Sequence, residues 1–193
     1  MLRKAGRHGL AATLLLGCAL AALAQPPLPT PSRAGDLIFR TGTEGISQAV
    51  LAVDLGSYSH VGMLVGGPEH WQVLHATPAE RPDARDAVVL DTLDFFLAPE
   101  RARAFAVFHL PTATPLQRQH AVTWALAQQG RPFHILDNQQ GTYCTTLVWK
   151  AWQQAGLDLQ VQFTSVQLPL LSGRYLLPSA LAASPLLQRL QMP

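Results

Sequence analysis

Cysteine and histidine are the residue types in this sequence that could carry out nucleophilic chemistry. The chain of 193 residues holds 2 cysteines and 7 histidines. Cys144 lies in the stretch QGTYCTTLVW. A cysteine whose proton is taken by a histidine can attack a carbonyl carbon and form an acyl-enzyme. This chemistry needs an element that presents Cys144 and a histidine within hydrogen-bond reach.

The residues after Cys144 have the apolar spacing of an amphipathic helix, which we expect to begin at or near Cys144 and to end at Gly156. One face of this helix carries Cys144, Leu147, Val148, Ala151, Trp152 and Ala155. The thiol is thus predicted on the inward face of the first turn. Free N–H groups and the helix dipole there favour negative charge, which predicts a lowered thiol pKa and amides that hold an oxyanion. A buried cysteine that only packs is the alternative.

Two histidines lie on neighbouring predicted strands, His60 on one and His75 on the other. If Val65 pairs with His70 in the intervening hairpin, His60 lies opposite His75 on one face. A register shift of one residue would separate the two rings. In the predicted arrangement His60 takes the thiol proton and His75 orients its ring. The remaining histidines beyond the N-terminal segment are predicted bystanders: His70, His109, His120 and His134.

Short runs of branched and aromatic residues predict strands at 36–40, 60–65, 71–76 and 104–110. Helical spacing follows at 46–55, and a short helical turn at 90–97 begins with Thr92. Thr114 and Gln117 form a capping box around Pro115, and Gly130 ends that helix. This pattern predicts a single α+β domain with a small antiparallel sheet or barrel packed against helices.

Four motifs in order carry a family resemblance: GDLIFR, YSHVGMLV, VLHA and GRPFHILDNQQGTYCTTLVWKAW. Together they resemble the circularly permuted papain-like, NlpC-type cysteine hydrolases, in particular the YiiX/YebB-like branch. The resemblance runs from about Gly35 to the segment LLPSALAASPLLQRL. It implies a permuted papain-like fold, Cys144 as the nucleophile and His60 as the base. The histidine precedes the cysteine here, as the permutation requires.

The sequence also departs from this family pattern. His75 stands where the branch usually carries a glutamate, and a histidine supplies no fixed negative charge. Phe133 and His134 replace a Tyr-Asp pair, and Thr145 follows the cysteine in place of serine. Tyr143 and Thr145 are candidates for substrate or oxyanion contacts, with packing as the alternative for Tyr143. Substrate identity does not carry over from the family.

The N-terminus predicts export. Residues 1–24 form a basic segment, an apolar run and an A-x-A pattern, typical of a cleaved signal peptide. Residues 25–34 are predicted as a proline-rich linker and 35–193 as the hydrolase domain. Alternatively Cys18 is lipidated, which would anchor the protein to a membrane. In both cases we expect a periplasmic, secreted or membrane-anchored protein.

Charge and cysteine content exclude some functions. The formal net charge of +2 becomes slightly negative once Arg3, Lys4 and Arg7 are removed with the signal. No basic stripe remains for nucleic acid. A single remaining cysteine, Cys144, cannot form an internal disulfide.

Three function classes remain from the sequence. The first is a thiol hydrolase that cleaves an amide in cell-wall peptides, without a cofactor or metal. The second uses the same Cys144 and His60 on a lipid ester or amide, by hydrolysis or acyl transfer, with the apolar segment 168–190 lining an acyl cleft. Packing of that segment on the core is the preferred interpretation. The third is a degenerate or zinc-binding site of Cys144, His60 and His75.

Overall fold

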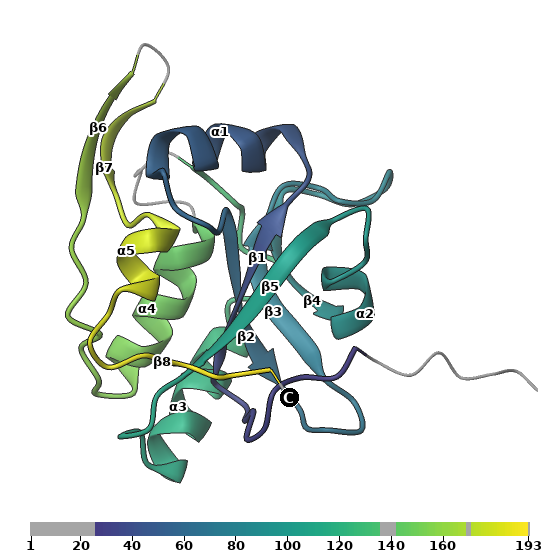
Figure 1. Ribbon diagram of the computed structural model, residues 1–193, viewed down its shortest axis with the longest axis vertical. Helices are drawn as coiled ribbons and strands as arrows, with labels where there is room; N and C mark the ends of the chain where they lie inside the picture. Colours follow the sequence, from purple (N-terminus) through teal and green to yellow (C-terminus); the bar gives the residue numbers. More distant parts are fainter. Residues whose placement is uncertain (1–25, 136–141, 169–170, 193) are drawn as a thin grey trace, which may run out of the picture.

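The computed structural model of this chain describes residues 26–135, 142–168 and 171–192. The predicted signal peptide and Cys18 lie outside the described residues. A six-stranded antiparallel sheet organises the fold (Figure 1). Its strands, in spatial order, are β4 (Ala87–Thr92), β3 (Gln72–Thr77), β2 (His60–Val65), β1 (Leu37–Gly42), β5 (Ala102–His109) and β8 (Gln188–Arg189).

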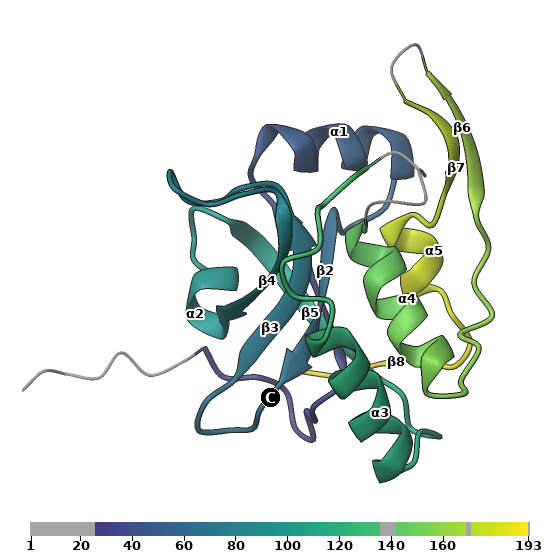
Figure 2. The same ribbon diagram turned by 180° about the vertical axis from the view of Figure 1, so that it is seen from behind.

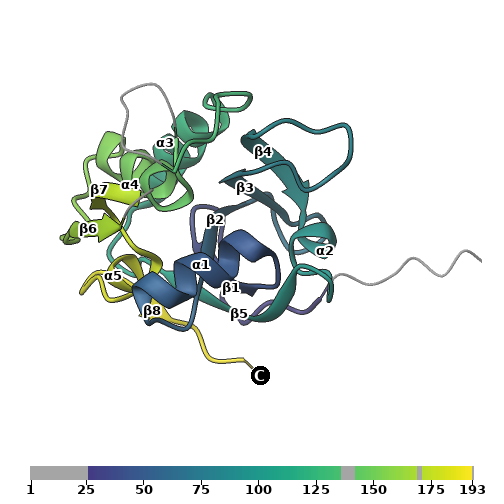
Figure 3. The same cartoon turned by 90° about the horizontal axis from the view of Figure 1, so that it is seen from above.

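Five helices and a hairpin accompany the sheet in the described part of the chain. They are α1 (Gly45–Asp54), α2 (Leu93–Phe96), α3 (Pro115–Leu126), α4 (Cys144–Gln154), α5 (Pro178–Ala182) and the hairpin of β6 (Thr164–Leu168) and β7 (Leu171–Tyr175). Helices α3, α4 and α5 lie together on one side of the sheet, beside the projecting β6–β7 hairpin (Figure 2). Seen from above, α1 lies across the end of the curved sheet (Figure 3). The predicted α+β class is confirmed.

Period-two alternation along β1, β2 and β3 separates two hydrophobic cores. The larger core joins one face of these strands to α3 and α4, and it includes Val61, Met63, Leu74, Leu147 and Trp152. The smaller core lies on the opposite face, where α2 covers the sheet; it comprises Ile38, Leu64, Trp71, Val73, Leu93, Phe96 and Val107. The sheet is therefore buried on both faces near the strands that carry the candidate site.

Local signals place the helix starts where the sequence predicted them. Thr114 Oγ1 accepts a hydrogen bond from the Gln117 backbone N–H at 3.2 Å, and Gln117 Oε1 accepts one from the Thr114 N–H at 3.0 Å. Thr92 Oγ1 caps α2 by accepting from the Phe95 N–H at 3.2 Å. Helix α4 begins at Cys144, as predicted.

The predicted hairpin register is wrong by two residues. Val65 pairs with Gln72, not with His70. Because side chains alternate with a period of two, a shift of two residues keeps each side chain on its predicted face. His60 and His75 therefore still share a face, diagonally rather than directly opposite. Strand β4 and the strands after α4 were not predicted.

The C-terminal segment packs on the core of the domain. This is the arrangement expected from the sequence in preference to the lining of an acyl cleft. Leu176 and Leu181 are fully buried in the larger core, and β8 pairs with β5 at the sheet edge. Within the predicted linker, Leu28 packs against the smaller core. Among the described residues, no helix combines the length and the apolar character that spanning a membrane requires.

We expect Leu147→Ala to reduce the free energy of unfolding by about 2–5 kcal/mol. Leu147 is fully buried in the helix that begins with Cys144, so its loss leaves a cavity between α4 and the sheet. Leu116→Ala on α3 is the matched control, because Leu116 is 59% exposed and its truncation should change stability by less than about 0.5 kcal/mol. Urea unfolding followed by circular dichroism measures both. Equal stability of the two variants would contradict this packing.

Candidate active site

Cys144 and His60 line one cavity of about 500 Å³, although they are 84 positions apart in the sequence. The start of α4 supplies Cys144, and the start of β2 supplies His60. The backbone of Val61, the residue after His60, hydrogen-bonds the thiol. Glu80, Arg40 and Phe133 line the same cavity.

His60 begins a chain of buried hydrogen bonds that leads away from the cavity. Its Nε2 lies 2.8 Å from Nδ1 of His75, and Nε2 of His75 lies 3.1 Å from Oδ2 of Asp91 on β4. Oδ1 of Asp91 accepts a hydrogen bond from Nη2 of Arg81 at 2.7 Å. Three neighbouring strands thus hold the imidazoles and the carboxylate in fixed positions.

Gly62 makes room for the diagonal pairing of the two histidines. A Cβ atom on Gly62 would lie 2.3 Å from Cγ1 of Val73 and 3.2 Å from Cβ of His75. A side chain at this position would therefore have to displace Val73 and would crowd His75, which favours glycine here. The ring of Phe96 packs against both imidazoles, with centroids 5.8 Å from His60 and 5.0 Å from His75.

The carboxylate determines which imidazole nitrogens carry protons. Burial raises the pKa of the Asp91 carboxyl. Hydrogen bonds from His75 and Arg81 outweigh this effect and hold the pKa of Asp91 below its ordinary value. An ionised carboxylate only accepts hydrogen bonds, so Nε2 of His75 must donate and its Nδ1 must accept. Nε2 of His60 then donates to His75. The free lone pair of His60 is therefore on Nδ1, which makes this nitrogen the available base.

Asp91 is the functional candidate that the sequence interpretation missed. It supplies the negative charge that His75 cannot, one ring further from the cavity than the glutamate expected from the family pattern. The signal lay in Ala87–Thr92, a run rich in branched residues that pairs with β3 in the structure. We interpreted its last residues as the approach to a helical turn.

The prediction of a lowered thiol pKa is wrong for this structure. Burial raises the pKa of Cys144 to about 11. Hydrogen bonds from the Val61 and Thr145 backbones and from Tyr143 lower it, as does the charge of Arg40, but they do not offset the burial. The helix N-terminus is present, yet desolvation of a thiolate costs more than the dipole and amides supply.

His60 is a neutral imidazole in this site. Burial lowers its pKa well below the ordinary value of 6.5, and the positive charge of Arg40 lowers it further. Because the thiol has the higher pKa, the proton stays on Cys144 in the free protein. Any transfer of this proton to His60 would therefore accompany nucleophilic attack by the thiol rather than precede it.

A buried ion pair borders the two histidines. Arg40 is 2% exposed; its Nη2 donates to Oε1 of Glu80 at 2.5 Å, and its Nη1 donates to the Phe96 carbonyl at 2.9 Å. Glu80 also accepts from Thr77 Oγ1 at 2.7 Å. Neither Arg40 nor Glu80 was singled out from the sequence, because the chain positions give no sign that they meet.

The two weaker site candidates occupy different environments. Tyr143 lines the cavity and hydrogen-bonds the Cys144 thiol. The Thr145 side chain is fully buried and donates to the Leu176 carbonyl at 2.6 Å, so only the Thr145 backbone faces the thiol. The predicted bystanders His70, His120 and His134 are exposed. His109 is half-buried near Asp36.

Residues 32–190 match the model of a family described as permuted papain-like amidase enzymes, YaeF/YiiX, C92 family. The chain belongs to this permuted papain-like amidase family. It is accordingly a cysteine hydrolase by family, and the YiiX-like resemblance seen in the sequence is confirmed. No curated protein matches the chain.

A solved structure supports the fold of this family member. The crystal structure titled metalloprotein yiiX, from Escherichia coli O157:H7, is similar with a TM-score of 0.69 and 21% sequence identity. The match covers 83% of this chain and 97% of that one. The permuted papain-like fold expected from the sequence is thereby confirmed.

Proposed function

We propose that this amidase cleaves an amide bond through an acyl-enzyme on Cys144, with His60 as the general base. The observation that carries this proposal is the buried hydrogen-bond chain from Asp91 through His75 to His60, which ends in the cavity that Cys144 lines. The chain leaves Nδ1 of His60 as an acceptor in a site where the thiol needs a base.

The reaction follows from these positions. Sγ of Cys144 attacks the carbonyl carbon while its proton passes to Nδ1 of His60. Backbone N–H groups in the first turn of α4 hold the oxyanion. The C–N bond then breaks and His60 gives its proton to the leaving amine. Water, deprotonated by His60, attacks the thioester and releases the acid and the thiol.

His75 and Asp91 are positioning residues in this scheme. Their hydrogen bonds keep His60 in the tautomer that accepts the thiol proton, and the Asp91 carboxylate stabilises the imidazolium that forms during attack. His75 and Asp91, which we call the relay, thus perform together the task that a single acidic residue performs beside the catalytic histidine in other triads.

We expect Asp91→Asn to lower kcat/KM by about 10²-fold. Nη2 of Arg81 needs an acceptor, so the asparagine oxygen should face Arg81 and its NH₂ group should face His75. Every hydrogen bond in the chain would then reverse, and Nδ1 of His60 would carry a proton. Steady-state kinetics on an activated ester measure the loss.

Two control variants separate this effect from general damage. Asp94→Asn, at an exposed position on α2, should leave kcat/KM unchanged. Arg81→Ala combined with Asp91→Asn should recover part of the lost activity, because the amide is then free to turn its oxygen toward His75. Identical kinetics for wild type and Asp91→Asn would show that the relay does not set the tautomer.

We further propose export and a cell-wall peptide as the substrate. The N-terminal 24 residues have the composition of a signal peptide, and an exported amidase meets peptide amides in the wall. The alternative substrate is a lipid ester or amide, in which case lipidation at Cys18 would keep the enzyme at the membrane. The expected substrate contains no nucleic acid, and the scheme needs no cofactor.

Turnover assays distinguish the substrates. Purified protein is incubated with muropeptides and, separately, with acyl esters and acyl amides of lipids, and products are followed by mass spectrometry. Release of a peptide fragment by wild type and not by Cys144→Ala supports the peptide proposal. Cleavage of lipids alone would replace it with the lipid alternative, and amine-dependent product would show acyl transfer. No turnover of either class would refute both substrates.

A further inference from the structure

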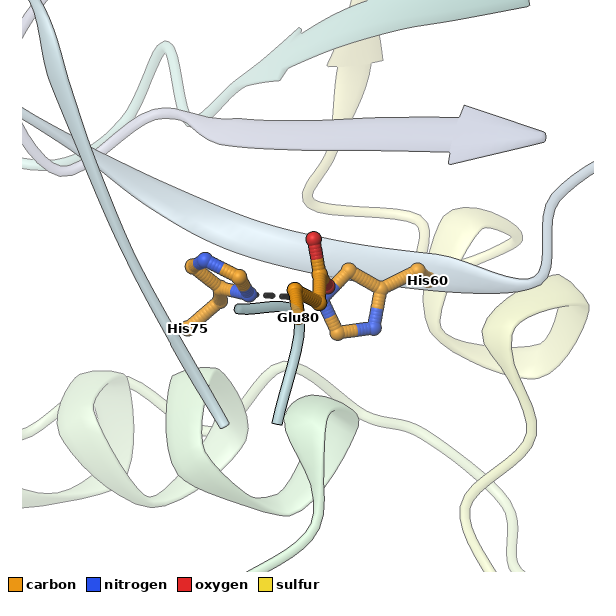
Figure 4. Close-up of side chains that lie close together, drawn as sticks. All are labelled: His60, His75 and Glu80. Carbon is orange, nitrogen blue, oxygen red and sulfur yellow. Dashed lines mark hydrogen bonds between the residues drawn. The ribbon is translucent and has the colours of Figure 1, made fainter. Parts of the chain in front are cut away.

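We infer that His60, His75 and Glu80 form a site for a first-row divalent metal ion such as Zn²⁺, and that a bound ion blocks the thiol chemistry of Cys144. One ligand atom from each of the three residues lies within 4.8 Å of the others. The three side chains converge on the space beside the His60–His75 hydrogen bond (Figure 4). Two imidazoles and one carboxylate are a donor set that tetrahedral zinc uses, with the fourth position open.

Glu80 has an oxygen available for an ion. Its side chain is 10% exposed, and Oε2 is buried without a hydrogen bond but forms an ion pair with Nε of Arg101 at 3.4 Å. Oε1 is held by Arg40 and Thr77. An ion pair at this distance without a hydrogen bond leaves lone pairs of the carboxylate oxygen unused. A metal ion between Glu80 and the imidazoles would give this oxygen a closer partner than Arg101.

The hydrogen bonds around His75 prepare it as a ligand. Its Nε2–H donates to Asp91, which leaves the lone pair of Nδ1 directed at the space between the two rings. A carboxylate that orients a metal-bound histidine from behind is the usual outer support of zinc ligands. Arg81 in turn holds Asp91 at 2.7 Å. The outer shell of a metal site is therefore already built into β3 and β4.

The ion and the hydrogen bond between the rings exclude one another. Two nitrogens bound to one tetrahedral zinc lie about 3.3 Å apart, whereas Nε2 of His60 and Nδ1 of His75 are now 2.8 Å apart. Admitting the ion therefore takes a separation of the two nitrogens by about 0.5 Å and a rotation of each ring that turns its lone pair toward the metal. Nε2 of His60 must then offer its lone pair, so the ring proton moves to Nδ1. In that tautomer Nδ1 donates and cannot accept the proton of Cys144.

The binding part of this inference stands apart from the proposed function, and the blocking part rests on it. Zn²⁺ titration by calorimetry on protein without a polyhistidine tag should show one ion per chain. Glu80→Gln and His75→Gln should each weaken binding by more than about tenfold, whereas His70→Gln, at an exposed turn position, should bind as wild type does. Circular dichroism checks that each variant folds.

Co²⁺ provides a second readout, because its visible absorption should show a tetrahedral site in wild type and lose intensity in Glu80→Gln. Cys144→Ala should still bind Zn²⁺, which separates this site from hydrolysis.

With wild type, one equivalent of Zn²⁺ should stop turnover of an activated ester, and a chelator should restore it. Undiminished Zn²⁺ binding by Glu80→Gln and His75→Gln would overturn the site. Turnover unchanged at full occupancy would overturn the block, and metal-free protein without turnover would refute only the proposed function.

Discussion

Replacing Cys144 with alanine should lower kcat/KM by at least about 10⁴-fold. The thiol is the only nucleophilic side chain that the proposed reaction uses, and no water molecule can replace it in forming a thioester. Cys144→Ser should also be inactive or nearly so, because a serine hydroxyl is harder to deprotonate than a thiol and His60 is a weak base here. Steady-state assays with an activated ester measure both variants.

The control for this prediction is Leu116→Ala, at an exposed position on α3 outside the cavity. It should leave the kinetics of purified protein unchanged. Cys144 is 1% exposed, so thermal unfolding must accompany the assays to show that the alanine variant is folded. Residual activity of Cys144→Ala within tenfold of wild type would rule out covalent catalysis by this residue.

Replacing His60 with glutamine should lower kcat/KM by about 10³-fold. Glutamine can donate its amide N–H to His75, which preserves part of the buried hydrogen-bond chain, but it cannot accept the thiol proton. Because burial raises the pKa of Cys144 to about 11, few thiolates form at neutral pH without a base. His120→Gln, an exposed position on α3, is the control and should retain full activity.

The pH profile gives this prediction a signature that a structural role would not produce. The base form of His60 is present above its pKa and is lost as the pH falls through it. Burial, assisted by the charge of Arg40, lowers that pKa well below 6.5. Wild-type kcat/KM should therefore hold its plateau through pH 6.5 and fall only at lower pH. In His60→Gln, the remaining rate should rise with hydroxide concentration because only thiolate reacts. A wild-type acid limb centred above pH 6.5 would contradict the assignment.

Local signals in the sequence predicted the elements that carry the proposed nucleophile and the proposed base. The apolar face from Cys144 to Ala155 places the thiol at the start of α4, and the run His60–Val65 is a strand with the predicted bounds. Both signals depend on residues close together in the chain. The shared face of His60 and His75 survived a register error because the error was of two residues.

Long-range contacts account for what the sequence did not reveal. Asp91 acts on His75 only because β4 pairs with β3, and Arg40 meets Glu80 across a separation of 40 residues. No local pattern encodes such pairings. The thiol pKa was mispredicted for the same reason: the helix start is visible in the sequence, but the burial of Cys144 beneath neighbouring elements depends on the assembled fold.

Trapping the acyl-enzyme tests the central claim most directly. Protein is mixed with p-nitrophenyl acetate at neutral pH, quenched with acid, and analysed by intact mass and peptide mapping. We predict that wild type gains one acetyl group on the peptide that contains Cys144, that Cys144→Ala gains none, and that His60→Gln acquires it far more slowly. Acetylation that avoids Cys144, or that proceeds equally fast in His60→Gln, would contradict a Cys144 nucleophile activated by His60.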